Sequence, residues 1–155
     1  MNKIRFILPV LVFIAITACN NSEKTVENED PKTALADSLQ KVVLDEHDIA
    51  MPKSMKIPAI QKEIQSLIDS ISKLPAKAQT ATAPYKSKLE DLNKELSDAY
   101  SSMDKWMTEF KLDSTFSNAE EKIKYMTEEK MKVGEVKEAV LNSIQKADSV
   151  LQKKF

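Results

Sequence analysis

Residues 47–55 carry the side chains in this chain that could hold a soft metal ion or haem. His47 is the only histidine, and Met51 and Met55 follow it at intervals of four residues. Thioether and imidazole ligands favour Cu(I), and a histidine–methionine pair also holds haem iron in some proteins. Methionine equally serves as a flexible filler of core gaps, and Pro52 would create such a gap. Three alternatives therefore stay open here: core filling, Cu(I) binding and haem binding.

Two methionines further along the chain join this group if the helices pair as expected. A first loop centred near residue 79 would set Met55 beside Met103 and Met51 beside Met107, with both helices antiparallel. The thioethers would then gather at one end of the molecule together with the imidazole. The candidate ligands of a Cu(I) or haem site are His47, Met51, Met55, Met103 and Met107.

Catalytic chemistry finds no support in the residue pattern, so we expect no enzyme. A Ser-His-Asp site needs a serine on a strained turn, and no serine here is framed by glycines, since Gly134 is the only glycine. Adjacent carboxylates fall outside the apolar stripes described below, and we assign them to solvent-exposed faces: Glu90–Asp91, Glu120–Glu121 and Glu128–Glu129.

The N-terminal residues predict an exported lipoprotein. Lys3 and Arg5 precede an apolar run over residues 6–16, which is too short to span a membrane and is typical of a signal peptide. Residues 16–19, Ile-Thr-Ala-Cys, resemble the lipobox of bacterial lipoproteins. That resemblance implies cleavage after residue 18 and a lipid on Cys19. An ordinary signal peptide, with its one cysteine near the cleavage site by chance, is the alternative.

The lipobox resemblance leads us to expect three segments and an envelope location. These are a signal peptide (1–18), a polar tether carrying the lipid (19–32) and a folded domain (33–155). The expected site is the cell envelope of a Gram-negative bacterium, at the outer membrane, with the lipid as membrane contact. Arg5 is the only arginine and the net charge is −1, so we expect no nucleic-acid partner.

Three apolar stripes at helical spacing predict an all-α fold, an elongated antiparallel three-helix bundle running up, down and up. The first arm should be kinked, or split into two helices in line, because Pro52 and Pro58 interrupt it, and Pro75 should end it. The second should begin near Thr82–Pro84 and end near Lys111. The third should begin with a capping box of Ser117 and Glu120 and continue to the chain end.

Lysines interrupt the apolar stripe of the third helix and suggest a place for a partner. Lys130 and Lys137 occupy positions of that stripe where an apolar residue would be expected. A groove beside them would be incompletely covered by the chain itself. We therefore expect a non-enzymatic structural or protein-interaction role, with a protein partner or self-association. The alternative function is binding of Cu(I) or haem.

Two short stretches resemble a family of small helical lipoproteins. The His47-Asp48 pair with Met51-Pro52-Lys53 and Met55, together with Trp106-Met107, is similar to Bacteroidota lipoproteins labelled "viral A-type inclusion protein". The resemblance implies a helical fold and an envelope location, and it brings no activity. Pro58, a second break in the first arm, departs from what this resemblance leads us to expect.

Overall fold

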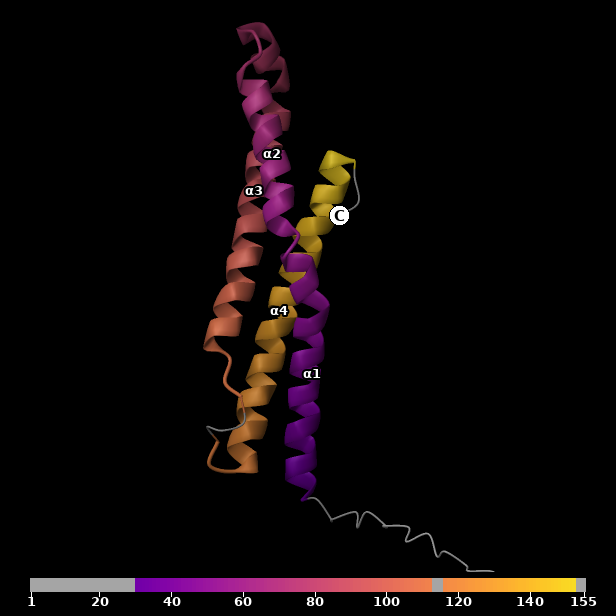
Figure 1. Ribbon diagram of the computed structural model, residues 1–155, viewed down its shortest axis with the longest axis vertical. Coiled ribbons are helices and arrows are strands. Elements are labelled where there is room, and N and C mark those ends of the chain that lie inside the picture. Colours follow the sequence, from indigo (N-terminus) through magenta and orange to yellow (C-terminus); the bar gives the residue numbers. More distant parts are fainter. Residues whose placement is uncertain (1–29, 113–115, 153–155) are drawn as a thin grey trace, which may run out of the picture.

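The computed structural model describes residues 30–112 and 116–152, and these residues form four helices with no strand. They are α1 (Pro31–Ser54), α2 (Ile57–Ser72), α3 (Ala76–Glu109) and α4 (Ala119–Leu151). In Figure 1, α1 and α2 rise one after the other, α3 descends beside them and α4 rises again. The expected all-α, up-down-up bundle with an interrupted first arm is confirmed. The predicted signal peptide, Cys19 and most of the tether lie outside the described residues.

The first arm breaks between its two prolines. Pro52 lies within α1, which still continues to Ser54, and Pro58 lies in the first turn of α2. A proline in a first turn loses no helical hydrogen bond, because the N–H groups there have no partner. The break itself is the two-residue turn Met55–Lys56, in which the Lys56 N–H bonds the carbonyl oxygen of Lys53 at 2.9 Å.

The second arm begins earlier than its proline suggested. α3 starts at Ala76, so Pro84 lies inside the helix and the expected start at Thr82–Pro84 is wrong. The chain turns over Lys73–Pro75, several residues before the expected loop centre near residue 79. Gln79 holds this turn, because its amide Nε2 donates to the carbonyl oxygens of Ser72 at 3.0 Å and Leu74 at 2.7 Å.

The third arm begins with an asparagine cap, one residue after the expected serine. The Asn118 side chain accepts from the Glu121 N–H at 2.9 Å, and the Glu121 carboxylate accepts from the Ser117 N–H at 2.9 Å. These bonds satisfy donors that a helix N-terminus leaves free. The expected Ser117–Glu120 box is therefore displaced by one residue. At the other end α4 stops at Leu151, where Gln152 adopts a left-handed conformation with φ 54°.

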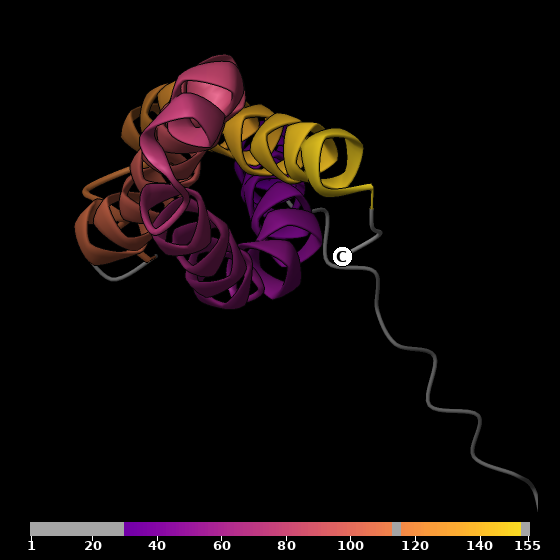
Figure 2. The ribbon, with the colours of Figure 1, turned by 90° about the horizontal axis from the view of Figure 1, so that it is seen from above.

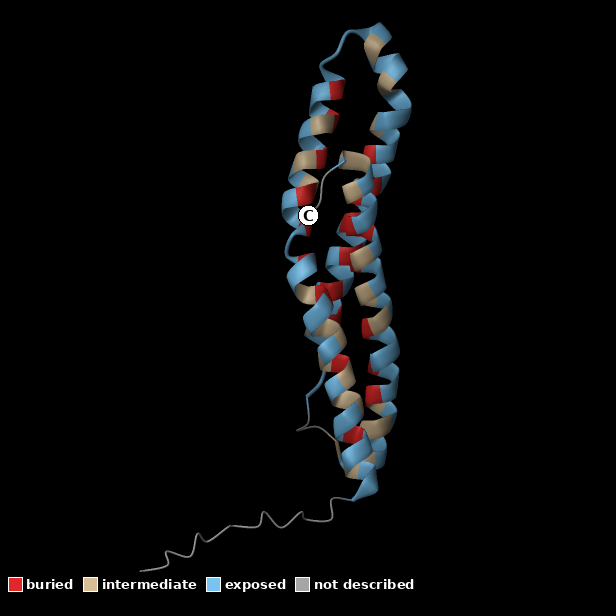
Figure 3. Cartoon of the chain, turned by 90° about the vertical axis from the view of Figure 1, so that its right-hand side faces the viewer, coloured by how far each residue is buried: buried red, intermediate tan, exposed pale blue. Residues whose placement is uncertain are grey.

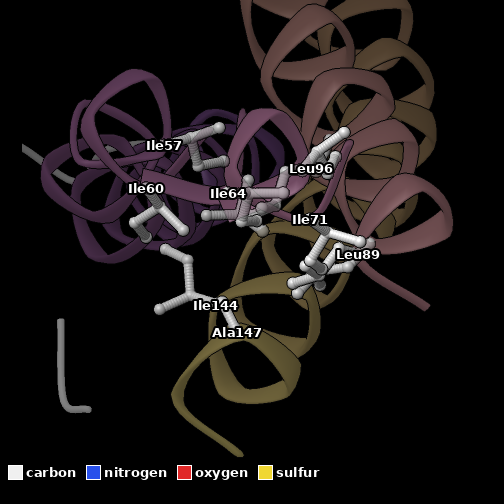
Figure 4. Packing of buried hydrophobic residues seen from close by; sticks show 12 residues of the cluster. Ile57, Ile60, Ile64, Ile71, Leu89, Leu96, Ile144 and Ala147 are labelled. Carbon is white, nitrogen blue, oxygen red and sulfur yellow. The ribbon is translucent and has the colours of Figure 1, made fainter. Parts of the chain in front are cut away.

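Two hydrophobic cores lie one above the other along the rod. The upper core joins α2, α3 and α4, and its aliphatic side chains point toward one another in Figure 4. The lower core joins α1, α3 and α4 and includes Trp106, Met103 and Met126. Figure 3 shows the buried residues on the inward faces of the helices, with exposed residues outside. Figure 2, a view from above, shows the arms arranged around a common axis.

α4 takes part in both cores and runs parallel to α1. Ion pairs cross between these two helices along the lower half of the rod: Lys32 with Glu120, Asp37 with Lys122 at 2.7 Å, and Glu46 with Lys137 at 2.5 Å. The α2–α3 hairpin extends beyond the C-terminal end of α4 (Figure 1). Among the residues that the structure describes, the top of the rod is therefore formed by α2 and α3 alone.

Burial predicts which leucines hold the bundle together. Leu96 in the upper core is 0% exposed, whereas Leu35 on α1 is 51% exposed. Replacing Leu96 with alanine should lower the free energy of unfolding by about 2–5 kcal/mol, because a cavity remains. The matched change Leu35→Ala should alter it by no more than about 0.5 kcal/mol. Urea unfolding followed by circular dichroism measures both, and equal losses would contradict the assigned core.

Candidate functional site

The lower core collects most of the methionines of the folded part. Met103 is 1% exposed and Met126 is 0% exposed, and both belong to the buried centre of this cluster. Met51 and Met107 are half-buried and pack against the same centre. Met55, in contrast, is 68% exposed at the break between α1 and α2. Two of the four predicted thioethers, Met51 and Met107, thus accompany the buried Met103, while Met55 lies outside.

The pairing of residues between α1 and α3 explains why Met55 does not lie beside Met103, as the sequence predicted. The rings of His47 and Trp106 have their centroids 5.6 Å apart, so His47 faces Trp106. The early turn at residues 73–75 and the break at Met55–Lys56 together shift the pairing by about one helical turn of 3.6 residues from the expected one. The predicted neighbours Met55 and Met103 are therefore wrong. Because the helices are antiparallel, Met51 is the residue that comes level with Met103.

His47 has a carboxylate on one ring nitrogen. Its Nδ1 lies 3.0 Å from the Oδ1 of Asp48, and the imidazole side chain is 22% exposed. A hydrogen bond from Nδ1 to a carboxylate fixes the orientation and tautomer of a histidine and leaves Nε2 as the nitrogen for a further ligand. The imidazole is thus held between the solvent and the lower core.

A row of aromatic rings continues from His47 toward the bottom of the rod. Trp106 stacks on Phe110 with centroids 4.8 Å apart, Phe110 lies 6.2 Å from Tyr125, and Tyr125 lies 5.1 Å from Phe116. These separations are in the range in which aromatic pairs attract one another. The row links α3, the connection after it and α4.

The phenol of Tyr125 is tied to the end of α3. Its oxygen accepts a hydrogen bond from the Lys111 N–H at 2.8 Å, and burial raises the pKa of the phenol above its usual value of 10.0. The Tyr125 ring therefore closes the lower core from below while its hydroxyl satisfies the backbone just past the helix end.

Glu129 is a buried carboxylate that the sequence analysis assigned to the surface. Its residue is 4% exposed, and its Oε2 accepts from the Trp106 indole N–H at 2.9 Å. Its Oε1 accepts from the Lys132 ammonium at 2.7 Å, which raises the pKa of Lys132. The solvent-exposed assignment is correct for Glu128 and wrong for Glu129. The spacing of the residues could have predicted the burial of Glu129, since it lies three residues after Met126 and four before Val133.

One of the two stripe lysines is covered instead of marking an open groove. The Lys137 side chain is 20% exposed and bonds Glu46 of α1 at 2.5 Å, which raises its pKa. Lys130, the other stripe lysine, is exposed. The groove that we expected beside them is thus bridged at Lys137 by an ion pair between α1 and α4.

An open groove lies elsewhere, between the upper halves of α3 and α4. Its volume is about 680 Å³, and we call it the α3–α4 groove. Its lining includes the core residue Leu92 and the half-buried Val150. The Lys146 ammonium reaches Glu95 across it at 2.5 Å. The rim carries charges of both signs and polar groups, from Lys88, Asp91, Glu95, Gln145, Lys146 and Ser149.

Other site types find no counterpart in the described part of the chain. Within residues 30–112 and 116–152 no three His, Cys, Asp or Glu side chains are grouped so that they could hold a metal ion. Over the same residues, no helix combines the length and the apolar character that crossing a membrane requires. No protein-family model matches the chain, and neither the curated proteins nor the solved structures contain a significant match.

The indole–carboxylate bond should contribute measurably to stability. Trp106→Phe keeps an aromatic ring in the stack but removes the N–H that bonds the buried Glu129 carboxylate. Loss of a hydrogen bond to a charged group costs about 1.5–3 kcal/mol, to which the smaller ring adds a packing loss. In a Glu129→Gln background the same change should cost less, because the acceptor is uncharged. Denaturant unfolding of the four variants measures this coupling.

The neighbouring exposed carboxylate provides the control. Glu128→Gln should leave the unfolding midpoint nearly unchanged, because surface substitutions alter stability by about 0.5 kcal/mol or less. An equal cost of Trp106→Phe in both backgrounds would mean that the indole contributes through packing alone.

Proposed function

We propose that this protein is a lipid-anchored helical module of the bacterial cell envelope that works by binding a protein partner. The single observation that supports binding is the α3–α4 groove together with the two-helix hairpin above it. Charges of both signs on the groove rim suit a partner helix with mixed charges. Half-buried Val150 adds apolar surface inside the groove.

Over residues 30–112 and 116–152, no third helix accompanies α2 and α3 at the top of the rod. α4 ends at Leu151, whereas α2 and α3 continue upward to the turn at residues 73–75 (Figure 1). Leu74 and Tyr85 near this turn have exposed side chains. Amphipathic helices bury their apolar stripe against neighbours, and a helix packs at about 8–10 Å from the one beside it. A partner helix that continues the line of α4 would cover this part of the hairpin.

The anchoring part of the proposal rests on the lipobox resemblance at Cys19. α1 begins at Pro31, and the residues between them span at most about 3.3–3.6 Å each. The tether would therefore attach the bottom of the rod, where α1 begins, to the membrane. The groove and the hairpin lie toward the opposite end, which is the end most accessible to a partner.

Lipidation predicts a clear result for one substitution. Cys19→Ala should abolish the incorporation of radiolabelled palmitate and move the protein from the membrane fraction to the soluble fraction, because the acyl chains supply the membrane affinity. Asn20→Ala, next to the cysteine, should keep both the label and the membrane fraction. Labelling that persists in Cys19→Ala would contradict the anchor.

Partner binding can be mapped by placing a photo-crosslinking amino acid at single positions in living cells. Tyr85 and Ser149 are exposed at the hairpin and the α3–α4 groove, whereas Ser38 is exposed on α1. We expect Tyr85 and Ser149 to give an adduct of one common mass, and Ser38 to give none. An adduct of twice the chain mass would identify the partner as a second copy.

A charge reversal tests whether the groove itself makes the contact. Lys88→Glu on the groove rim should reduce the Ser149 adduct, while Lys56→Glu at the α1–α2 break should leave it unchanged. The absence of any adduct at Tyr85 and Ser149, or adducts of equal yield at Ser38, would overturn the binding role.

A further inference from the structure

We propose that the lower core binds one soft monovalent cation, Cu(I), between α1 and α3. The ligands that the structure brings together are the imidazole of His47 and the thioethers of Met51, Met103 and Met107. This site lies below the α3–α4 groove along the rod and shares none of the residues that line the groove, so the two sites can be tested separately.

The candidate ligands occur as two pairs, each on one face of one helix. His47 and Met51 are four residues apart on α1, and Met103 and Met107 are four residues apart on α3. Residues at this spacing lie above one another on the same side of a helix. Each helix therefore presents two soft donors one turn apart.

Contacts across the interface show that these two faces meet. His47 lies against Trp106, with the ring centroids 5.6 Å apart, and Trp106 sits between the two α3 methionines in sequence. The hydrophobic cluster around Trp106 includes all three thioethers. An antiparallel register that pairs His47 with Trp106 places Met107 near His47 and Met103 near Met51.

The four candidate ligands differ in how far their side chains are exposed to solvent. His47 is partly exposed, Met51 and Met107 are half-buried, and Met103 is 1% exposed. An ion would therefore meet the imidazole first and the buried thioether last. The Ser54 hydroxyl lies 3.6 Å from the Met51 sulfur, so this sulfur already faces a polar group.

The chemistry of the donors selects the ion. Thioethers and a neutral imidazole carry no charge, so a divalent cation would be buried without compensation, whereas a monovalent soft ion meets its preferred ligands at lower cost. Asp48 orients His47 through Nδ1, the arrangement that supports most histidine ligands, and leaves Nε2 to face the ion.

One tryptophan can report binding at this cluster, and two exposed methionines can serve as controls. Trp106 is the only tryptophan, so quenching of tryptophan fluorescence reports binding at this cluster alone. Met55 and Met131 are exposed methionines outside the cluster, and they control for non-specific thioether binding. Methionine and leucine have similar volumes, so Met→Leu changes remove the sulfur with little effect on packing.

The experiment titrates the purified full chain with Ag(I), a redox-stable soft ion, and then with Cu(I) in competition with a chromophoric Cu(I) chelator. We expect one ion per chain and quenching of Trp106. Met51→Leu and Met107→Leu should each weaken binding by at least the roughly 10- to 100-fold that loss of a supporting residue costs. Met55→Leu and Met131→Leu should bind like the unchanged chain, and circular dichroism confirms that each variant is folded.

Several results would overturn the proposal. These are the absence of binding against the chelator, binding without fluorescence quenching, and equal affinity of Met51→Leu and Met55→Leu. A titration with haemin distinguishes the remaining ligand class, because a haem absorbance band that disappears in His47→Gln, without Cu(I) binding, would replace Cu(I) with haem.

Discussion

The break between α1 and α2 is the constraint on which the rest of the structure depends. Because the helix stops at Ser54 and restarts at Ile57, the first arm changes neighbours along its length. Its lower half packs mainly on α4, and its upper half packs mainly on α3. An unbroken arm would follow one groove along the bundle. The interrupted arm creates two separate cores, and α3 and α4 are the elements that both cores share.

The two cores differ in chemistry as well as in position. The upper core consists of isoleucine, leucine, valine and alanine side chains. The lower core combines thioethers, aromatic rings and the buried Glu129, which is paired with Trp106 and Lys132. Aliphatic packing supplies stability without directional demands, whereas a buried carboxylate is tolerated only when its oxygens are satisfied. The polar bonds of the lower core therefore fix the relative positions of α3 and α4.

Periodicity predicted the number and direction of the arms, but not the details on which the site depends. Stripes such as Leu89, Leu92 and Leu96 report which face is buried, and this signal is strong over long helices. Turn position is a local property, and Pro84 was a misleading guide because α3 begins at Ala76 and continues through this proline. The position of the α2–α3 turn and the break in the first arm both set the register, and their combined error displaced the facing pairs by about one helical turn of 3.6 residues. This shift, together with the place of Met55 in the exposed break, separated Met55 from Met103.

Glu129 shows that the type of a single residue does not predict whether its side chain is buried. Its spacing places it on the buried stripe of α4, but a carboxylate is assigned to solvent unless a donor is known to face it. The donor is the indole N–H of Trp106, which lies on another helix, so only the fold identifies the pair. The same holds for Lys137, whose partner Glu46 belongs to α1. Charged residues within an apolar stripe thus mark contacts between helices as readily as open grooves. The α3–α4 groove was not predicted, because no charged residue within a stripe pointed to it.

The lower core also determines what an ion could do for the bundle. α1 and α3 touch only sparsely, and each is held mainly through α4. A ligand that binds only the folded state stabilises it by RT ln(1 + L/Kd), where L is the free ligand concentration. A cation held by His47 and Met51 on one side and Met107 on the other would join α1 to α3 directly. Its effect would therefore be largest on the helix pair that the protein's own packing connects least.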